Sequence, residues 1–268
     1  MTPPADAEAL LKAGDLTGAL SAVKAAIRKA PADADLRFTL FQMLSATGDW
    51  EGASNQLVAF SELTGRQSPM AIIFNDLIKA EVMRKLVFQG EKVPVIFGEP
   101  PEWVPLLVQA NHHFAKGEYE AALKLRTQAL EEAPAVSGNC NGTPFAWMMD
   151  GDTRLGPLLE LMMQGTYYWV PQQRVRELIF TEPTHLRDRV WVAVDVTFEG
   201  GGASHAFMPV RYPGAHAWQN ASEQLARTTE WDSPEEGIYL GRGQRVFMTP
   251  DAEIPMLDAR EVTLNPVA

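Results

Sequence analysis

The stretch GDLTGA at residues 14–19 recurs as GDWEGA at residues 48–53, 34 positions later in the chain. A third copy, GEYEAA at residues 117–122, begins 69 positions after the second, which is close to two further periods. In each copy the leading glycine permits a tight turn between two helices, and the final alanine lets the second helix approach the first closely. The repeat therefore predicts stacked helical hairpins, an α-solenoid, in the first half of the chain.

A period of 34 residues is typical of tetratricopeptide repeats. Pro31 and Pro134 each follow their glycine by 17 positions, where a proline ends the second helix of a hairpin. One hairpin cannot bury its apolar face alone, so stacked copies share a core and form a concave surface that usually binds an extended or helical peptide. The repeats predict a helical domain over residues 1–135, either as a binding surface or as a scaffold only.

Helical periodicity extends this interpretation to seven segments. They cover residues 7–12, 16–30, 34–46, 50–63, 70–88, 103–116 and 119–133. The stretch 89–101 contains two glycines and three prolines and is predicted to be a loop.

The sequence changes character near residue 136, where glycines, aromatic residues and short β-branched runs replace long amphipathic segments. Strands are predicted at 145–149, 166–170, 175–179, 190–198 and 205–210, with a glycine turn at 200–202 between the last two. Helices are predicted at 155–164 and 217–228. The chain is therefore expected to be a two-part α+β protein, with a tetratricopeptide-like domain at 1–135 and an α+β domain at 136–268.

Composition restricts the classes of partner. The net charge is −11, which argues against binding nucleic acid or an anionic membrane and favours a basic or mixed partner segment. Cys140 is the single cysteine, so neither an internal disulfide nor a multi-cysteine metal site is expected. The sequence shows neither a membrane span nor an apolar leader. We predict a cytoplasmic protein.

Asp150 and Asp152 beside Arg154 form the cluster that most resembles a catalytic site, because paired carboxylates can bind metal or exchange protons. The loop fails as a calcium site at its fifth, sixth and twelfth positions. A structural role is favoured, in which one aspartate caps a helix near Leu155 while Arg154 bonds across the turn. The adjacent pair His112-His113 cannot form one metal-binding face. Neither a cofactor nor a metal is predicted.

Several ordered motifs resemble the ImpE family, also called TagJ. They are NGTPFAW at 141–147, DGDTRLGP at 150–157, GTYYWVP at 165–171, RYPG at 211–214 and ARTTEW at 226–231. The resemblance covers essentially the whole chain, and its one clear departure is Met149 and Gly151, where the family more often has alanine. It implies a non-enzymatic adaptor of bacterial type VI secretion that binds the N-terminal helix of the small sheath subunit. It also implies indirect assistance to the AAA+ ATPase that disassembles contracted sheath.

Candidate partner-binding residues are the aromatic, arginine and acidic members of these motifs, since Tyr, Trp and Arg dominate interface hot spots. They are Trp147, Asp150, Asp152, Arg154, Tyr167, Tyr168, Trp169, Arg187, Arg211, Tyr212, Arg227 and Trp231. The same rings also serve as core anchors. Alternation along the strand predicts that Tyr168 or its two neighbours face away from the core. We expect the partner groove in the C-terminal domain or at its seam with the helices.

Two other functions stay open at this point. One is a hydrolase-like or metal-assisted enzyme that uses Asp150, Asp152 and Arg154, with Glu160 or Arg187 as further candidates. The other is a generic tetratricopeptide-type chaperone unrelated to secretion.

Overall fold

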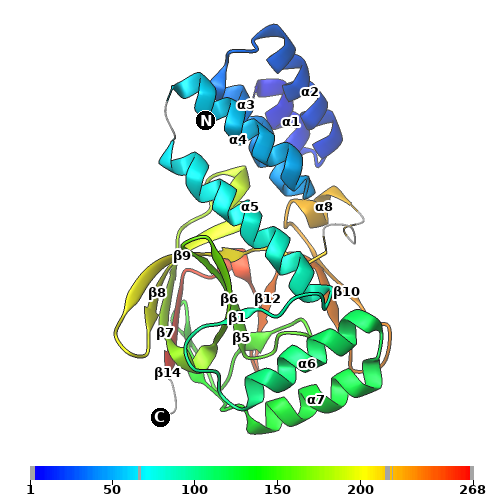
Figure 1. Ribbon diagram of the computed structural model, residues 1–268, viewed down its shortest axis with the longest axis vertical. Helices are drawn as coiled ribbons and strands as arrows, with labels where there is room; N and C mark the ends of the chain where they lie inside the picture. The colour runs from blue at the N-terminus through cyan, green and yellow to red at the C-terminus, as the bar shows by residue number, and fades with distance from the viewer. Residues whose placement is uncertain (1–3, 66–67, 215–217, 219, 266–268) are drawn as a thin grey trace.

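The helices before residue 65 occupy one end of the molecule, the strands and the two helices between residues 103 and 132 occupy the other, and the long helix α5 crosses between them (Figure 1). The computed structural model describes residues 4–65, 68–214, 218 and 220–265. The helices before the sheet are α1 (Ala5–Lys12), α2 (Leu16–Lys29), α3 (Ala34–Thr47), α4 (Trp50–Thr64), α5 (Pro69–Phe88), α6 (Trp103–Lys116) and α7 (Tyr119–Glu132). All seven predicted helical segments are confirmed.

The three repeated motifs form the hairpin turns α1–α2, α3–α4 and α6–α7. Their glycines, Gly14, Gly48 and Gly117, have φ angles of 84°, 77° and 73°, a left-handed conformation that L side chains rarely adopt. Their alanines, Ala19, Ala53 and Ala122, are completely buried. The aspartates of the first two copies cap the following helix, since each accepts a hydrogen bond from a backbone N–H three residues on. The repeated glycine thus marks the turn of each hairpin, and the repeated alanine marks the close contact between its two helices.

The main sheet has nine strands in the order β1-β6-β5-β9-β8-β7-β14-β2-β3. Its strands are β1 (Val95–Ile96), β2 (Ser137–Cys140), β3 (Thr143–Phe145), β5 (Leu158–Met163), β6 (Thr166–Pro171), β7 (Val175–Phe180), β8 (Trp191–Phe198), β9 (Ala203–Pro209) and β14 (Glu261–Asn265). Only β1 and β6 pair in parallel; the other neighbours in this sheet are antiparallel. The predicted glycine turn at 200–202 joins β8 and β9. The two-part α+β architecture is confirmed.

Smaller elements flank this sheet. One set of three strands pairs β13 (Glu253–Pro255), β12 (Val246–Met248) and β4 (Met149–Asp150), and one pair joins β10 (Thr229–Asp232) to β11 (Leu240–Gly243). Short helical turns are η1 (Gln172–Arg174), η2 (Leu186–Arg189), α8 (Ala221–Gln224) and η4 (Met256–Asp258). Of these turns, η2 packs on α3.

The helix predicted at 155–164 is wrong. Residues 158–163 form strand β5, which pairs with β6 on one side and β9 on the other, and all six of its residues are buried. A strand covered on both faces has a continuous apolar run, which periodicity cannot distinguish from a buried helix. With this helix gone, neither Asp150 nor Asp152 can cap it, so the predicted capping role is wrong as well.

Two further predictions need correction. The helix expected at 217–228 is limited to α8, residues 221–224, while residues 217 and 219 lie outside the described part of the chain. The strand expected at 145–149 is divided between β3 of the nine-stranded sheet and β4 of the three-stranded sheet. Both errors come from boundaries that depend on tertiary pairing more than on local propensity.

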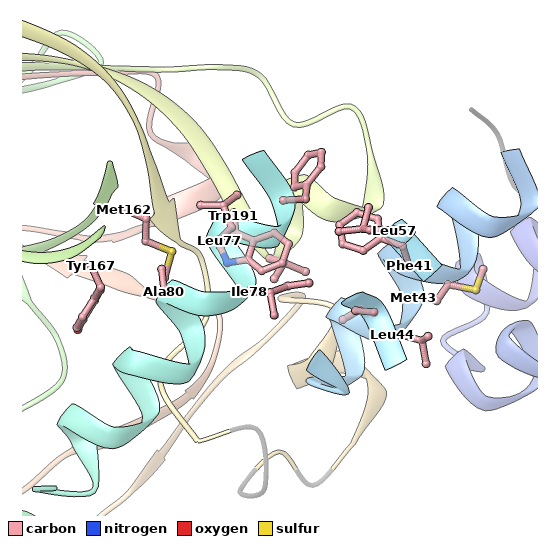
Figure 2. Close-up of a cluster of buried hydrophobic side chains, with 14 of the residues drawn as sticks. Phe41, Met43, Leu44, Leu57, Leu77, Ile78, Ala80, Met162, Tyr167 and Trp191 are labelled. Atoms are coloured by element: carbon pink, nitrogen blue, oxygen red, sulfur yellow. The ribbon is translucent and has the colours of Figure 1, made fainter. Parts of the chain in front are cut away.

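One hydrophobic core connects the helices to the sheet. Figure 2 shows Leu77 and Ile78 of α5 grouped with Trp191 of the sheet, and Phe41 of α3 lies to one side of this group. These side chains belong to a single buried cluster that also contains Trp169. The proposed division at residue 135 remains a prediction, but β1, which precedes it, is already a strand of the main sheet.

Candidate functional site

A buried ion network lies where α5 meets the sheet. Arg84 of α5 donates from Nε and Nη2 to the two carboxylate oxygens of Glu160 on β5, at 2.6 Å and 3.1 Å. Arg245 forms a second ion pair with Glu160, and the Tyr167 hydroxyl donates to the same carboxylate. Burial alone would raise the pKa of Glu160, but Arg245 and Arg84 outweigh it and lower that pKa to about 2. Glu160 is therefore a permanent buried anion.

The network continues away from α5 toward β4. Arg245 Nη1 lies 3.1 Å from Asp150 Oδ2, and Asp150 Oδ1 accepts the backbone N–H of Asp152 at 2.8 Å. Asp152 is held in turn by two hydrogen bonds from Arg154, at 2.8 Å and 2.6 Å. Burial raises the pKa of Asp150 to about 7, although Arg245 opposes this shift. The predicted bond of Arg154 across the turn is confirmed, with Asp152 as its partner.

Arg211 fastens the sheet to the carboxyl end of α3. It is buried, and its guanidinium donates to the backbone carbonyls of Ala46 and Ser45, the second at 3.0 Å. These carbonyls belong to the last turn of α3, where the helix dipole favours a cation. The carbonyl of Arg211 also accepts a hydrogen bond of 2.8 Å from Arg84. The first helices are thus joined to the sheet by polar contacts as well as by the shared core.

Part of the helical surface is covered by the chain itself. The turn η2, between β7 and β8, packs on α3, and the Arg187 guanidinium lies 5.7 Å from the Phe38 ring and 5.2 Å from the Phe74 ring. The backbone N–H of Arg187 also donates to Gln42 Oε1 at 3.4 Å. Arg187 is therefore engaged in an internal contact between the sheet and the helices.

Beside η2 lies a cavity of about 460 Å³, which we call the seam cavity. It is bounded by α1, α3, residues 183–189 and the turn after α8. Its charged or titratable lining residues are Glu8, Lys12, His185, Arg189 and Arg227. Cations outnumber acids there, in contrast with the net charge of the whole chain. The seam cavity thus lies between the first helices and the sheet domain, and its lining has more positive than negative side chains.

Profiles of two families match the chain: ImpE protein at residues 142–263 and tetratricopeptide repeat at residues 10–63. A Pseudomonas aeruginosa protein named type VI secretion system accessory component TagJ is 42% identical over 260 residues, 97% of this chain and 91% of that protein. This chain belongs to the ImpE family. The crystal structure of protein VPA1032 from Vibrio parahaemolyticus is also similar, with a TM-score of 0.88, 29% identity and 97% of each chain covered.

Half of the twelve residues that we predicted to bind a partner are buried inside the protein. Buried members are Asp150, Asp152, Tyr167, Trp169, Arg211 and Tyr212; partly buried members are Trp147, Arg154, Tyr168, Arg187 and Trp231; only Arg227 is exposed. Tyr167 and Trp169 belong to the core that includes α5, whereas Tyr168 packs edge-on against Phe97 from the other face of the strand. Of the twelve, only Arg227 lines the seam cavity.

Gly151, where this chain departs from the usual ImpE pattern, lies against an aromatic ring. A Cβ atom at this position would lie 2.6 Å from the Trp231 ring and 3.2 Å from the Tyr212 hydroxyl. The glycine therefore lets Trp231 approach the turn that carries the two aspartates.

Arg84, Glu81 and Arg245 were absent from the predicted site, although they hold the ion network together. Arg84 gave one usable signal, since it occupies an apolar position of the α5 pattern with Leu77 and Ala80. In the described part of the chain, we find no group of three or more His, Cys, Asp or Glu residues placed to hold a metal ion. Nor is any described helix long and apolar enough to cross a membrane.

Proposed function

We propose that this ImpE-family protein is a non-enzymatic, cytoplasmic adaptor of a bacterial type VI secretion system. The supporting observation is the 42% identity, over nearly the whole length of both chains, to a protein named as an accessory component of that system. Its described surface includes tetratricopeptide helices and a cavity that these helices share with the sheet domain. Such arrays commonly bind helical or extended peptides.

The partner we propose is the N-terminal helix of the small subunit of the contractile sheath. An amphipathic helix needs an apolar groove with a few polar anchors. The seam cavity offers apolar side chains from α1, α3 and η2, namely Leu11, Met43 and Leu186, beside its charged residues. By holding this helix, the protein would assist sheath disassembly by the AAA+ ATPase.

The charged residues that suggested an enzyme have structural partners instead. Asp150, Asp152 and Glu160 each form an ion pair with an arginine, and all three are buried. Buried ion pairs of this kind fix the orientation of the elements that carry them. These contacts favour the adaptor over an enzyme that uses the same cluster.

Isothermal titration of the purified protein with a synthetic peptide of the sheath subunit's N-terminal helix tests this function. We expect saturable binding in the micromolar range or tighter. Absence of heat at high micromolar peptide would contradict the proposal. A partner screen from the same cells dominated by unrelated clients would instead favour a general chaperone.

A further inference from the structure

Two arginines line the seam cavity, Arg189 and Arg227, and their hydrogen-bond acceptors in the described structure are neutral. Glu8, the acid of its lining, already pairs with Lys12 at 2.8 Å. Arg189 donates to the carbonyl of Leu225, and Arg227 donates to the carbonyls of Leu11 and Lys12. All these acceptors are neutral, and neither arginine forms an ion pair within the described residues. The cavity therefore holds cationic groups that an anion could neutralise.

These two arginines also interact unfavourably with one another. Burial lowers the pKa of Arg189, and the charge of Arg227 lowers it further. A carboxylate placed between the two guanidinium groups would raise the pKa of both arginines. Each guanidinium can donate a charge-assisted hydrogen bond to it. The two arginines thus favour an anionic ligand over a neutral or basic one.

Two polar residues of α3, Thr39 and Gln42, also line the cavity. Both are buried, and the Thr39 hydroxyl is closed to solvent as well as to the cavity. The preference for an anion therefore rests on the two arginines.

We infer that the seam cavity is a carboxylate-binding site that receives an aspartate or glutamate side chain from the partner helix. The apolar side chains of Leu11, Met43, Leu186 and Leu225 suit the methylene stem of such a side chain, and Arg189 and Arg227 suit its carboxylate. The identity of the partner rests on the proposed function; the carboxylate preference rests on the cavity alone. A helix with one buried acid and basic flanks would also match the overall charge of −11.

The test compares the double variant Arg189→Gln, Arg227→Gln with a matched control, Arg28→Gln, Lys29→Gln. The control removes the same charge from exposed positions at the end of α2. Two probes are titrated: the sheath-helix peptide and acetyl-hexaglutamate amide. We expect the cavity variant to bind both probes about tenfold more weakly or worse, the change expected for losing a charge-assisted contact. The control should bind both probes like the wild type.

A third variant, Arg189→Lys, Arg227→Lys, separates binding from folding. It keeps both positive charges, so it should bind both probes more tightly than the glutamine variant. Equal binding of the cavity variant and the control would overturn the carboxylate site and leave the adaptor function intact. If the wild type binds hexaglutamate but not the sheath peptide, the carboxylate site stands and the adaptor function is overturned. Failure of both probes on the wild type would overturn both.

Discussion

Arg84 and Glu160 lie 76 positions apart in sequence and form two hydrogen bonds in the interior of the protein, at 2.6 Å and 3.1 Å. The first residue belongs to the helix that spans the molecule and the second to a central strand of the sheet. Both are almost completely buried, with side-chain exposures of 3% and 0%. A charge buried in this way is tolerated only with good partners, so the pair fixes how the helices sit on the sheet.

Glu160→Gln is expected to destabilise the fold by about 3–5 kcal/mol, because it leaves Arg84 and Arg245 buried without their shared carboxylate. Urea unfolding followed by circular dichroism measures this loss. Glu199→Gln, which breaks a more exposed pair with Arg174, should cost less than about 1 kcal/mol. Equal midpoints for the two variants would mean that the ion network does not hold the domains together.

Asp150 should make the stability of the protein depend on pH. Its pKa is about 7 in the folded chain and 3.8 as the ordinary value, so between about pH 4 and pH 7 the folded state holds a proton that the unfolded state has released, and the charged pair with Arg245 forms above that range. The stabilisation is complete below pH 4 and is lost as pH rises through 7. Relative to Asp150→Asn, the wild type should lose on the order of 2 kcal/mol between pH 5 and pH 8. A difference in the free energy of unfolding between Asp150→Asn and the wild type that stays constant from pH 5 to pH 8 would refute the prediction.

Gly151→Ala tests the contact that distinguishes this chain from the more frequent family pattern. The added methyl group would clash with the Trp231 ring, so we expect a loss of about 1–3 kcal/mol, typical of overpacking. Gly200→Ala is the control, since a Cβ atom there meets nothing within 4 Å. Thermal melts of the two variants supply the comparison, and equal melting temperatures would show that Trp231 moves aside freely.

Tyr168→Ala distinguishes two locations for the partner groove. Tyr168 packs against Phe97 and does not line the seam cavity. We expect the variant to be less stable by about 1–3 kcal/mol, with unchanged affinity for the sheath-helix peptide. If calorimetry gives clearly weaker binding at a temperature where the variant is folded, the groove lies on the sheet domain instead.

The helical hairpins could be predicted from sequence because their signals are local. A glycine with positive φ, an aspartate three positions before its N–H partner and a small alanine all act within one turn. Strand β5 could not be predicted in this way, since its run of buried residues is compatible with either helix or strand until its neighbours are known.

The candidate site was harder still. Aromatic and arginine residues favour interfaces and cores alike, and only the placement of Tyr167, Trp169 and Arg211 shows them to be internal. The partners of Glu160 come from positions 84 and 245, and no local pattern connects those three residues. The cavity residues Thr39 and Arg189 are likewise brought together only by the packing of η2 on α3.

Titration of this protein with the complete small sheath subunit, and with the same subunit lacking its N-terminal helix, tests the adaptor function most directly. We predict saturable binding to the complete subunit and none to the truncated one. Equal binding to both would contradict helix recognition, and no binding to either would contradict the proposed role in type VI secretion.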